Sequence, residues 1–317
     1  EQSDREGALP VSTAADAISL TAAGEEASQI RWLAPVAALA VGTSGGEKTI
    51  QGSNLAEAIT PSNAAILPAS SVGVADLPPA RIDAAVLYVS RDRKRLHELA
   101  YKLDADSYLS PEMTLLAGHI GEESPLAEIC FQRRPWRILW ARRDDGLLVG
   151  FTYNREEEVT AWHRHRLAGE EARGVGLCCI PGEGDDELWV AVERRIGGEL
   201  RRSVELLERD RSFAAGEGSE EAFFVDAGLS YSGSPTQVLR GLEHLEGETV
   251  AVLADGAVHR PLRVEGGEIR LDRPTRRLHA GLPFASWLET MNLEPGLGDG
   301  AALGRPKTLT AVDLLVV

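Results

Sequence analysis

The segment Arg137–Leu167, RILWARRDDGLLVGFTYNREEEVTAWHRHRL, decides the fold class of this chain. Two runs within it, Leu147–Tyr153 and Val159–Leu167, have the two-residue side-chain period of β-strands. Asp145-Gly146 precedes the first run, and such a pair is the strongest short signal for a hairpin turn. The segment therefore predicts a small antiparallel meander. Its buried strand face should carry Leu147, Val149 and Phe151.

Short apolar runs separated by turn signals recur along most of the chain, with a second Asp-Gly hairpin at Asp255-Gly256. Ser110-Pro111-Glu112 predicts one short helix reaching Ile120, because Ser is a good N-cap and Pro suits the first turn. Ser53–Ala80, rich in Pro, Ser and Ala, should be a long surface excursion. Further strands are predicted at 36–41, 47–51, 84–89, 96–103, 126–132, 137–142, 175–180, 187–194, 199–207, 249–253, 257–264 and 268–272.

Antiparallel meanders of about 40 residues are typical of radial β architectures. We therefore predict an all-β fold of incomplete β-propeller-like meanders, although no strict WD or kelch signature is present. The chain opens at Glu1 without a methionine and stops in LTAVDLLVV, a pattern typical of an unfinished strand. We expect it to be a fragment of a longer protein.

The composition argues against two classes of protein, those that bind nucleic acid and those that span a membrane. The 317 residues carry 33 basic and 49 acidic side chains, so the net charge is −16. Phosphate binding needs clustered Lys and Arg, so this balance argues against a nucleic-acid-binding surface. The most apolar stretch, Trp32–Val41, is interrupted by Pro35 and is too short to span a bilayer. We expect no membrane-spanning segment.

His163 and His165 are the one candidate metal site, because alternation places both on one face of the predicted strand. A metal site needs a third ligand, however, and Glu156–Glu158 are more simply a solvated hairpin loop. Structural use of the histidines is therefore favoured over metal binding or a proton-linked gate. Trp162 lies on the opposite face, where Arg164 and Arg166 suggest a cation–π ladder.

Other chemical motifs are weak. Three cysteines are too few and too badly spaced for a disulfide framework or zinc site, and burial as small apolar side chains is favoured. The adjacent Cys178 and Cys179 should point to opposite strand faces. No phosphate loop, GxSxG elbow or HExxH motif occurs, and Gly182–Glu187 lacks the ligand spacing of a calcium loop. We expect no cofactor, no catalytic residue and no enzymatic activity.

A series of segments in a particular order resembles the tail nozzle family of short-tailed bacteriophages and prophages, the tail tubular protein B type. The series is IRWLAP (30–35), VGTSGGE (41–47), LAEAITPSNA (55–64), AAVLYVSRDRKRLHELAY (84–101), SPEMTLLAGHI (110–120), ILWARRDDGLLVGFTYNREEEVTAWHRH (138–165) and ELWVAVERRIGG (187–198). The segment 223–280 resembles a small β-barrel of such proteins, which is often likened to a domain of ubiquitin-activating enzymes.

The resemblance implies a domain organisation. Residues 1–222 would form a propeller-like β domain, 223–280 an inserted small β-barrel, and 281–317 would return to the main domain.

It also implies a structural virion protein, made in the bacterial host cytoplasm and located in the phage tail. Such proteins form a ring, expected to be a hexamer, that contacts other tail proteins (adaptor and fibres). They line or close the channel through which viral DNA passes without specific binding. Family members carry N-terminal sequence absent here, which puts ring formation by this chain alone in doubt.

Two other function classes stay open. A glycan-binding or glycan-cleaving propeller for host attachment would need exposed aromatic residues or paired acids. Four tryptophans on predicted strands are better explained by packing: Trp136, Trp140, Trp162 and Trp189. A bacterial adaptor propeller would close its ring within one chain. The third meander, predicted at 249–272, differs from the first two at 126–167 and 175–207, which weakens that alternative.

Overall fold

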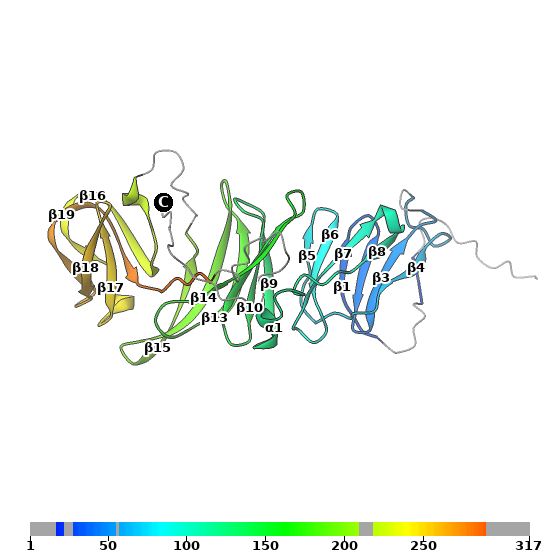
Figure 1. Cartoon of the computed structure of the whole chain (residues 1–317), viewed down its shortest axis with the longest axis horizontal. Coiled ribbons are helices and arrows are strands. Elements are labelled where there is room, and N and C mark those ends of the chain that lie inside the picture. The colour runs from blue at the N-terminus through cyan, green and yellow to red at the C-terminus, as the bar shows by residue number, and fades with distance from the viewer. Residues whose placement is uncertain (1–16, 22–27, 55–56, 209–217, 290–317) are drawn as a thin grey trace, which may run out of the picture. The chain divides into compact units, whose positions relative to one another are not determined.

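The structure is a computed structural model that describes residues 17–21, 28–54, 57–208 and 218–289 (Figure 1). In these residues, nineteen strands form five antiparallel sheets, none of which is closed. The all-β prediction is confirmed. Contacts divide the chain into two compact units, residues 1–195 with 200–207, and residues 196–199 with 208–317.

The first unit contains four meanders in chain order. The first sheet has β1 Ile30–Pro35, β2 Leu39–Thr43, β3 Gly46–Gln51 and β4 Ala65–Ser70; the second has β5 Ala80–Ile82, β6 Ala85–Val89, β7 Leu96–Lys102 and β8 Ser107–Leu109. The third has β9 Leu126–Gln132, β10 Ile138–Arg143, β11 Leu148–Asn154 and β12 Val159–His165, and the fourth has β13 Glu170–Pro181, β14 Asp186–Ile196 and β15 Glu199–Leu206.

Successive sheets of this unit pack face to face, with a separate apolar core between each pair. β6 shows the arrangement clearly, because all five of its residues are buried. Val86 and Tyr88 contribute to the core shared with the first sheet, whereas Leu87 and Val89 contribute to the core shared with the third. Alternation along the strand therefore supplies side chains to two cores.

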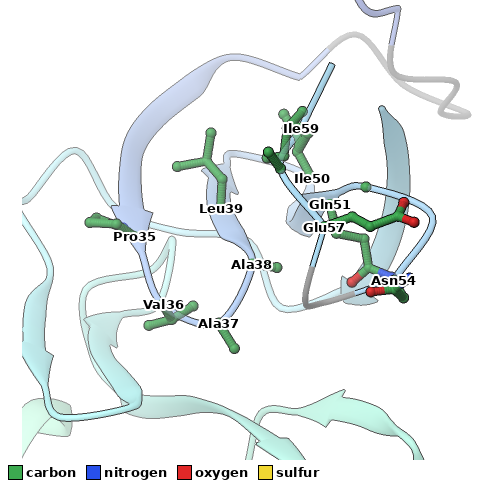
Figure 2. A pocket seen from close by; sticks show the side chains of 12 residues that line it. Pro35, Val36, Ala37, Ala38, Leu39, Ile50, Gln51, Asn54, Glu57 and Ile59 are labelled. Atoms are coloured by element: carbon green, nitrogen blue, oxygen red, sulfur yellow. The ribbon is translucent and has the colours of Figure 1, made fainter. Parts of the chain in front are cut away.

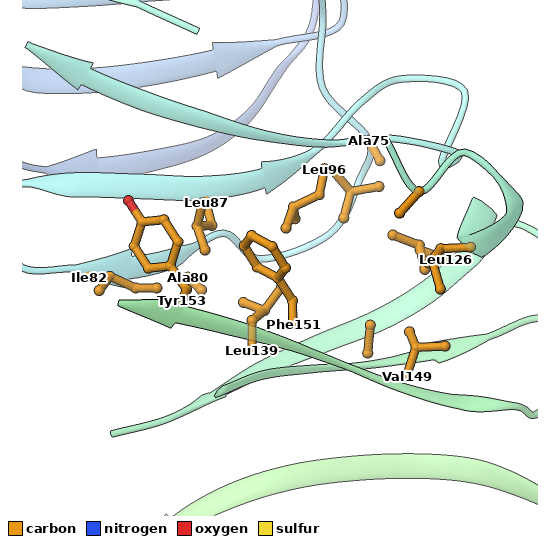
Figure 3. Packing of buried hydrophobic residues seen from close by; sticks show 14 residues of the cluster. Ala75, Ala80, Ile82, Leu87, Leu96, Leu126, Leu139, Val149, Phe151 and Tyr153 are labelled. Atoms are coloured by element: carbon orange, nitrogen blue, oxygen red, sulfur yellow. The ribbon is translucent and has the colours of Figure 1, made fainter. Parts of the chain in front are cut away.

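The core between the second and third sheets has more buried residues than the other two cores of this unit described here, and Figure 3 shows β11 projecting Phe151 and Tyr153 into it beside Leu87. Val149 and Phe151 are fully buried, as predicted, and Leu147 is half-buried against the same core. Leu148 faces the other way and joins Trp140 in the core shared with the fourth sheet. Burial of both faces explains why this strand is almost continuously apolar.

Polar contacts between turns also connect each sheet to the next. Arg91 donates to the carbonyl oxygen of Ser44 at 3.2 Å, which joins the first two sheets. Arg93 forms a two-bond ion pair with Asp144 at 3.0 and 2.6 Å, which joins the second and third. The amide of Gly174 donates to the carbonyl oxygen of Gly146 at 2.8 Å, which joins the third and fourth.

Both predicted Asp-Gly hairpin turns are present. Gly146, between β10 and β11, has φ +84°, and Asp255 and Gly256 have φ +49° and +74°. The Asp255-Gly256 turn has positive φ at two successive residues, which is the type I′ geometry whose twist matches that of the flanking strands, whereas at the first turn only Gly146 has a positive φ. Asn, Asp and Gly tolerate this conformation best, so the Asp-Gly sequence is explained by the backbone.

The second unit contains β16 Asp226–Arg240, β17 Thr249–Ala254, β18 Ala257–Arg263 and β19 Glu268–Leu282. Their order is β16-β19-β17-β18, so the last strand lies between the first two and the sheet is no simple meander. Among the described strands, β16 and β18 each pair on one side only. The sheet is therefore open, which differs from the closed small barrel implied by the resemblance.

The strands of the second unit run from Asp226 to Leu282, in the region expected as an insertion at 223–280. Most of the expected return to the main domain, residues 290–317, falls outside the described residues.

Two local predictions are wrong. The helix expected from Ser110 to Ile120 is confined to α1, His119–Glu122, because Pro111 and Met113 bond the backbone of β7 as an extended segment. The excursion at 53–80 contains β4, which pairs with β3 and places Ile66 opposite Ile50.

Three short 3₁₀ turns, Leu103–Ala105, Ser219–Glu221 and Glu243–Leu245, complete the described helical elements. In the described part of the chain, no helix is long and apolar enough to cross a membrane.

Replacing Phe151 by Ala should lower the free energy of unfolding by about 3–5 kcal/mol, because it leaves a cavity between two sheets. Urea titration followed by circular dichroism measures this change. Leu116→Ala is the control, since Leu116 is 98% exposed and the expected change is below about 0.5 kcal/mol. Equal effects of the two substitutions would contradict the packing described above.

Candidate functional site

His163 and His165 lie on β12, at the edge of the third sheet. The strand register places His163 opposite Gly150 and His165 opposite Leu148 on β11. Both rings pack edge-on against Trp140, with ring centroids 5.6 and 4.9 Å from it. The two histidines therefore share one strand face, as predicted, and that face looks toward the core between the third and fourth sheets.

The two rings are directly hydrogen-bonded. Nδ1 of His163 and Nε2 of His165 are 2.6 Å apart, so one nitrogen carries the proton and the other accepts it. Nε2 of His163 lies 3.5 Å from Oγ1 of Thr152. Such a pair is satisfied when both rings are neutral, because protonating both would set two N–H groups against each other.

Gly150 makes room for the His163 ring. A Cβ atom at this position would lie 2.0 Å from Cε1 of His163, which is far inside contact distance. Gly42 has the same role in the first sheet, where a Cβ would lie 2.2 Å from the Trp32 ring. In both cases an aromatic ring covers the backbone of a glycine on the neighbouring strand.

Burial lowers the pKa of both histidines, because charging a desolvated imidazole is unfavourable. For His165, burial and the neighbouring His163 lower the pKa to about 4. The pair is therefore neutral at pH 7 and suited to packing, or to binding a cation through its lone pairs.

The metal hypothesis depends on a third ligand. Within the described residues, no group of three or more His, Cys, Asp or Glu side chains could hold a metal ion. The geometry of the histidine pair is accounted for by the hydrogen bond between its rings and by Trp140.

Trp162 lies on the opposite face of β12, as alternation predicted, but its environment differs from the predicted cation–π ladder. Its ring stacks on Phe151 with centroids 4.6 Å apart, and its Nε1 donates to the carbonyl oxygen of Met113 at 2.9 Å. Arg164 and Arg166 are exposed. Trp162 is therefore part of the core between the second and third sheets.

A cysteine contact is the main feature that sequence reasoning missed. Sγ of Cys130 on β9 and Sγ of Cys179 on β13 are 2.8 Å apart, between the third and fourth sheets. Both are half-buried, whereas Cys178 is exposed on the opposite face of β13, which corrects the expectation that all three are buried. Only sheet packing joins residues 49 positions apart, so no spacing rule could have revealed the contact.

Three glutamates among the described residues are buried, and they lie on different sheets. Glu98 on β7 is ion-paired with Arg155 at 3.3 Å. Glu193 on β14 lies between two arginines, Arg173 and Arg202, whose hydrogen bonds lower its pKa. Both carboxylate oxygens of Glu47 on β3 lack a hydrogen-bond partner. These glutamates do not form the facing pair that glycoside hydrolysis requires.

A shallow recess lies beside the β1–β2 turn (Figure 2). Glu57 is the only ionisable side chain among its lining residues, which are Pro35–Leu39, Ile50–Gly52, Asn54 and Glu57–Ile59. Catalytic sites combine a pocket with converging polar groups of perturbed pKa. This recess offers one carboxylate among mainly apolar side chains.

Substituting Gly150 by Ala should displace His163 and reduce the free energy of unfolding by about 1–3 kcal/mol, the usual cost of overpacking. Urea titration provides the measurement. In Gly176→Ala the new Cβ would lie 3.7 Å from Cβ of Ala191, an ordinary contact, so this control should be nearly neutral. In a His163→Ala background the cost of Gly150→Ala should fall, and an unchanged cost would refute the proposed clash.

The histidine pair should make stability depend on pH. The unfolded chain protonates these histidines near pH 6.5, whereas the folded chain resists protonation until about pH 4 at His165. The unfolded state therefore binds more protons in this window, and stability falls as pH is lowered through it. Urea titrations between pH 7 and pH 4 should show a smaller fall in a His163→Asn/His165→Asn variant than in the wild type, and parallel profiles would exclude this contribution.

The comparisons with known proteins leave the chain without an assigned family. No protein-family model matches it, and the search of curated proteins found no match. The stacked sheets and the order of the segments from IRWLAP to ELWVAVERRIGG are the observations that bear on function.

Proposed function

We propose that this chain is a non-enzymatic structural protein of a bacteriophage or prophage tail, of the nozzle or tail-tube type. It would line or close the channel through which DNA is ejected. The order of the segments from IRWLAP to ELWVAVERRIGG motivates the family assignment.

The observation that best supports a structural role is the uninterrupted stack of sheets in the first unit. Three apolar cores connect the four sheets in series, and ion pairs and hydrogen bonds between turns supplement them. Close-packed interiors are poorly compressible and transmit strain. Such a stack suits a wall that must keep its shape while a stiff polymer passes.

Net charge provides a second, weaker argument. A chain of charge −16 repels the phosphate backbone, so DNA can move along its surface without adhering.

A channel wall requires self-association. The proposal includes a ring, expected to be a hexamer, with contacts to adaptor and fibre proteins of the tail. The protein would be made in the bacterial host cytoplasm and reside in the virion.

The glycan-binding alternative retains one specific observation. Of the four tryptophans considered in the sequence, Trp136 is 52% exposed at the β9–β10 turn, whereas Trp140 is buried and Trp162 and Trp189 are half-buried. Exposed aromatic rings are common in sugar-binding sites, but Trp136 is the one exposed ring among these four, which falls short of the cluster that this function would need.

Light scattering coupled to size-exclusion chromatography tests the assembly proposal. The protein should elute as a ring with a mass near six subunits, or assemble when other tail proteins are added. Duplex DNA should bind weakly even at low salt. A strictly monomeric protein that binds glycans, with binding lost in Trp136→Ala, would favour the alternative. Unchanged assembly after both histidines are replaced by alanine would exclude a gate at His163 and His165.

A further inference from the structure

The contact between Cys130 and Cys179 lies in a rigid part of the first unit. Cys130 is opposite Trp140 in the third sheet, and Cys179 is opposite Leu188 in the fourth. Trp140 and Leu188 are both buried in the core between these sheets. The two sulfur atoms are therefore brought together by the packing of two sheets.

Hydrogen bonds hold the two strands in register on both sides of the contact. Two residues before the cysteines, the amide of Leu177 donates to Oε2 of Glu128 at 3.2 Å. Two residues after Cys130, Nε2 of Gln132 donates to the carbonyl oxygen of Asp186 at 3.0 Å, and Asp186 is the ladder partner of Pro181. The bond between Glu128 and Leu177, and that between Gln132 and the ladder partner of Pro181, keep Cys130 beside Cys179.

We propose that Cys130 and Cys179 form an intramolecular disulfide that cross-links the third and fourth sheets. The sulfur atoms are 2.8 Å apart, and a disulfide bond is about 2.05 Å long, so a shift of less than about 1 Å is needed. Cys178 is excluded as the partner of Cys130, because it points to the opposite face of β13.

A low-molecular-weight disulfide, such as oxidised glutathione, is a sufficient co-reactant. One cysteine thiolate attacks the reagent and releases one thiol, and the second cysteine then attacks the mixed disulfide and releases another. Two protein thiols are oxidised, one reagent disulfide is reduced to two thiols, and the cysteine protons pass to the released thiolates. The cross-link depends only on these side chains and the oxidant, so it does not rest on the proposed function.

The environment of Cys130 predicts that the disulfide forms slowly at neutral pH. The hydrogen bond with Cys179 and burial both raise the pKa of Cys130, which lowers the fraction of reactive thiolate. Both thiols are nevertheless half-buried rather than enclosed, so a small reagent can reach them.

Peptide mapping by mass spectrometry tests the proposal on the wild-type chain. The native protein is incubated with oxidised glutathione, unreacted thiols are alkylated, and fragment spectra distinguish Cys178 from Cys179. The expected product is a Cys130–Cys179 disulfide, with Cys178 outside it. Three alkylated cysteines, or a disulfide that includes Cys178, would overturn the proposal.

The same oxidation in urea is the matched control, because an unfolded chain has no reason to prefer Cys179 over its neighbour. Cys130 should then pair with Cys178 and Cys179 in about equal amounts. Equal amounts in the native protein would show that the fold does not direct the bond.

Oxidation should also raise the Tm of the first unit by roughly 5–10 °C, as expected for closing a loop of about 50 residues, and dithiothreitol should reverse the rise. Cys178→Ser should retain the shift and Cys130→Ala should lose it. A cross-linked protein with an unchanged Tm would show that the bond does not brace the two sheets.

Discussion

The face-to-face packing of consecutive antiparallel sheets is the constraint on which the rest of the first unit depends. The two interior sheets have a neighbouring sheet on each face, so their central strands β6 and β11 are buried and mainly apolar on both sides. These strands therefore lack the alternation of apolar and polar side chains that is usual in an antiparallel sheet with one exposed face. The side chains that are polar in these sheets must therefore find partners within the stack.

This constraint explains the character of the histidine pair. His163 and His165 face a neighbouring sheet, and the hydrogen bond between their rings together with Trp140 replaces the solvent that they would otherwise contact. Desolvation keeps them neutral, and Gly150 provides the space for one ring. The cysteine pair lies in the same interface, so two chemically distinctive contacts of this chain arise from a single packing arrangement.

A stack of this kind suits a function based on shape more than one based on chemistry. Its buried acids are separated on different sheets, and the recess beside the β1–β2 turn presents one carboxylate. The proposed channel-wall function uses the stiffness of the cores and the negative charge of the chain. The second unit, with its non-sequential strand order, is a separate compact element.

The local sequence pattern was sufficient to predict much of this structure. Two-residue alternation and turn signals determined the all-β class, most of the strands, the Asp145-Gly146 and Asp255-Gly256 hairpins, and the common face of His163 and His165. Each of these features depends on residues close together in the chain. The helix expected after Ser110 failed because Pro111 and Met113 bond the distant β7 backbone. β4 was missed because its strand character depends on pairing with β3.

Tertiary structure alone decided what lies between the sheets. The stacking of Trp162 on Phe151 and the approach of Cys130 to Cys179 require strands from different parts of the chain to meet. Alternation states which residues share a face, but it does not state which other sheet that face will contact. The physical reason is that side-chain direction is a local property of the backbone, whereas the packing partner is chosen by the burial of whole apolar faces.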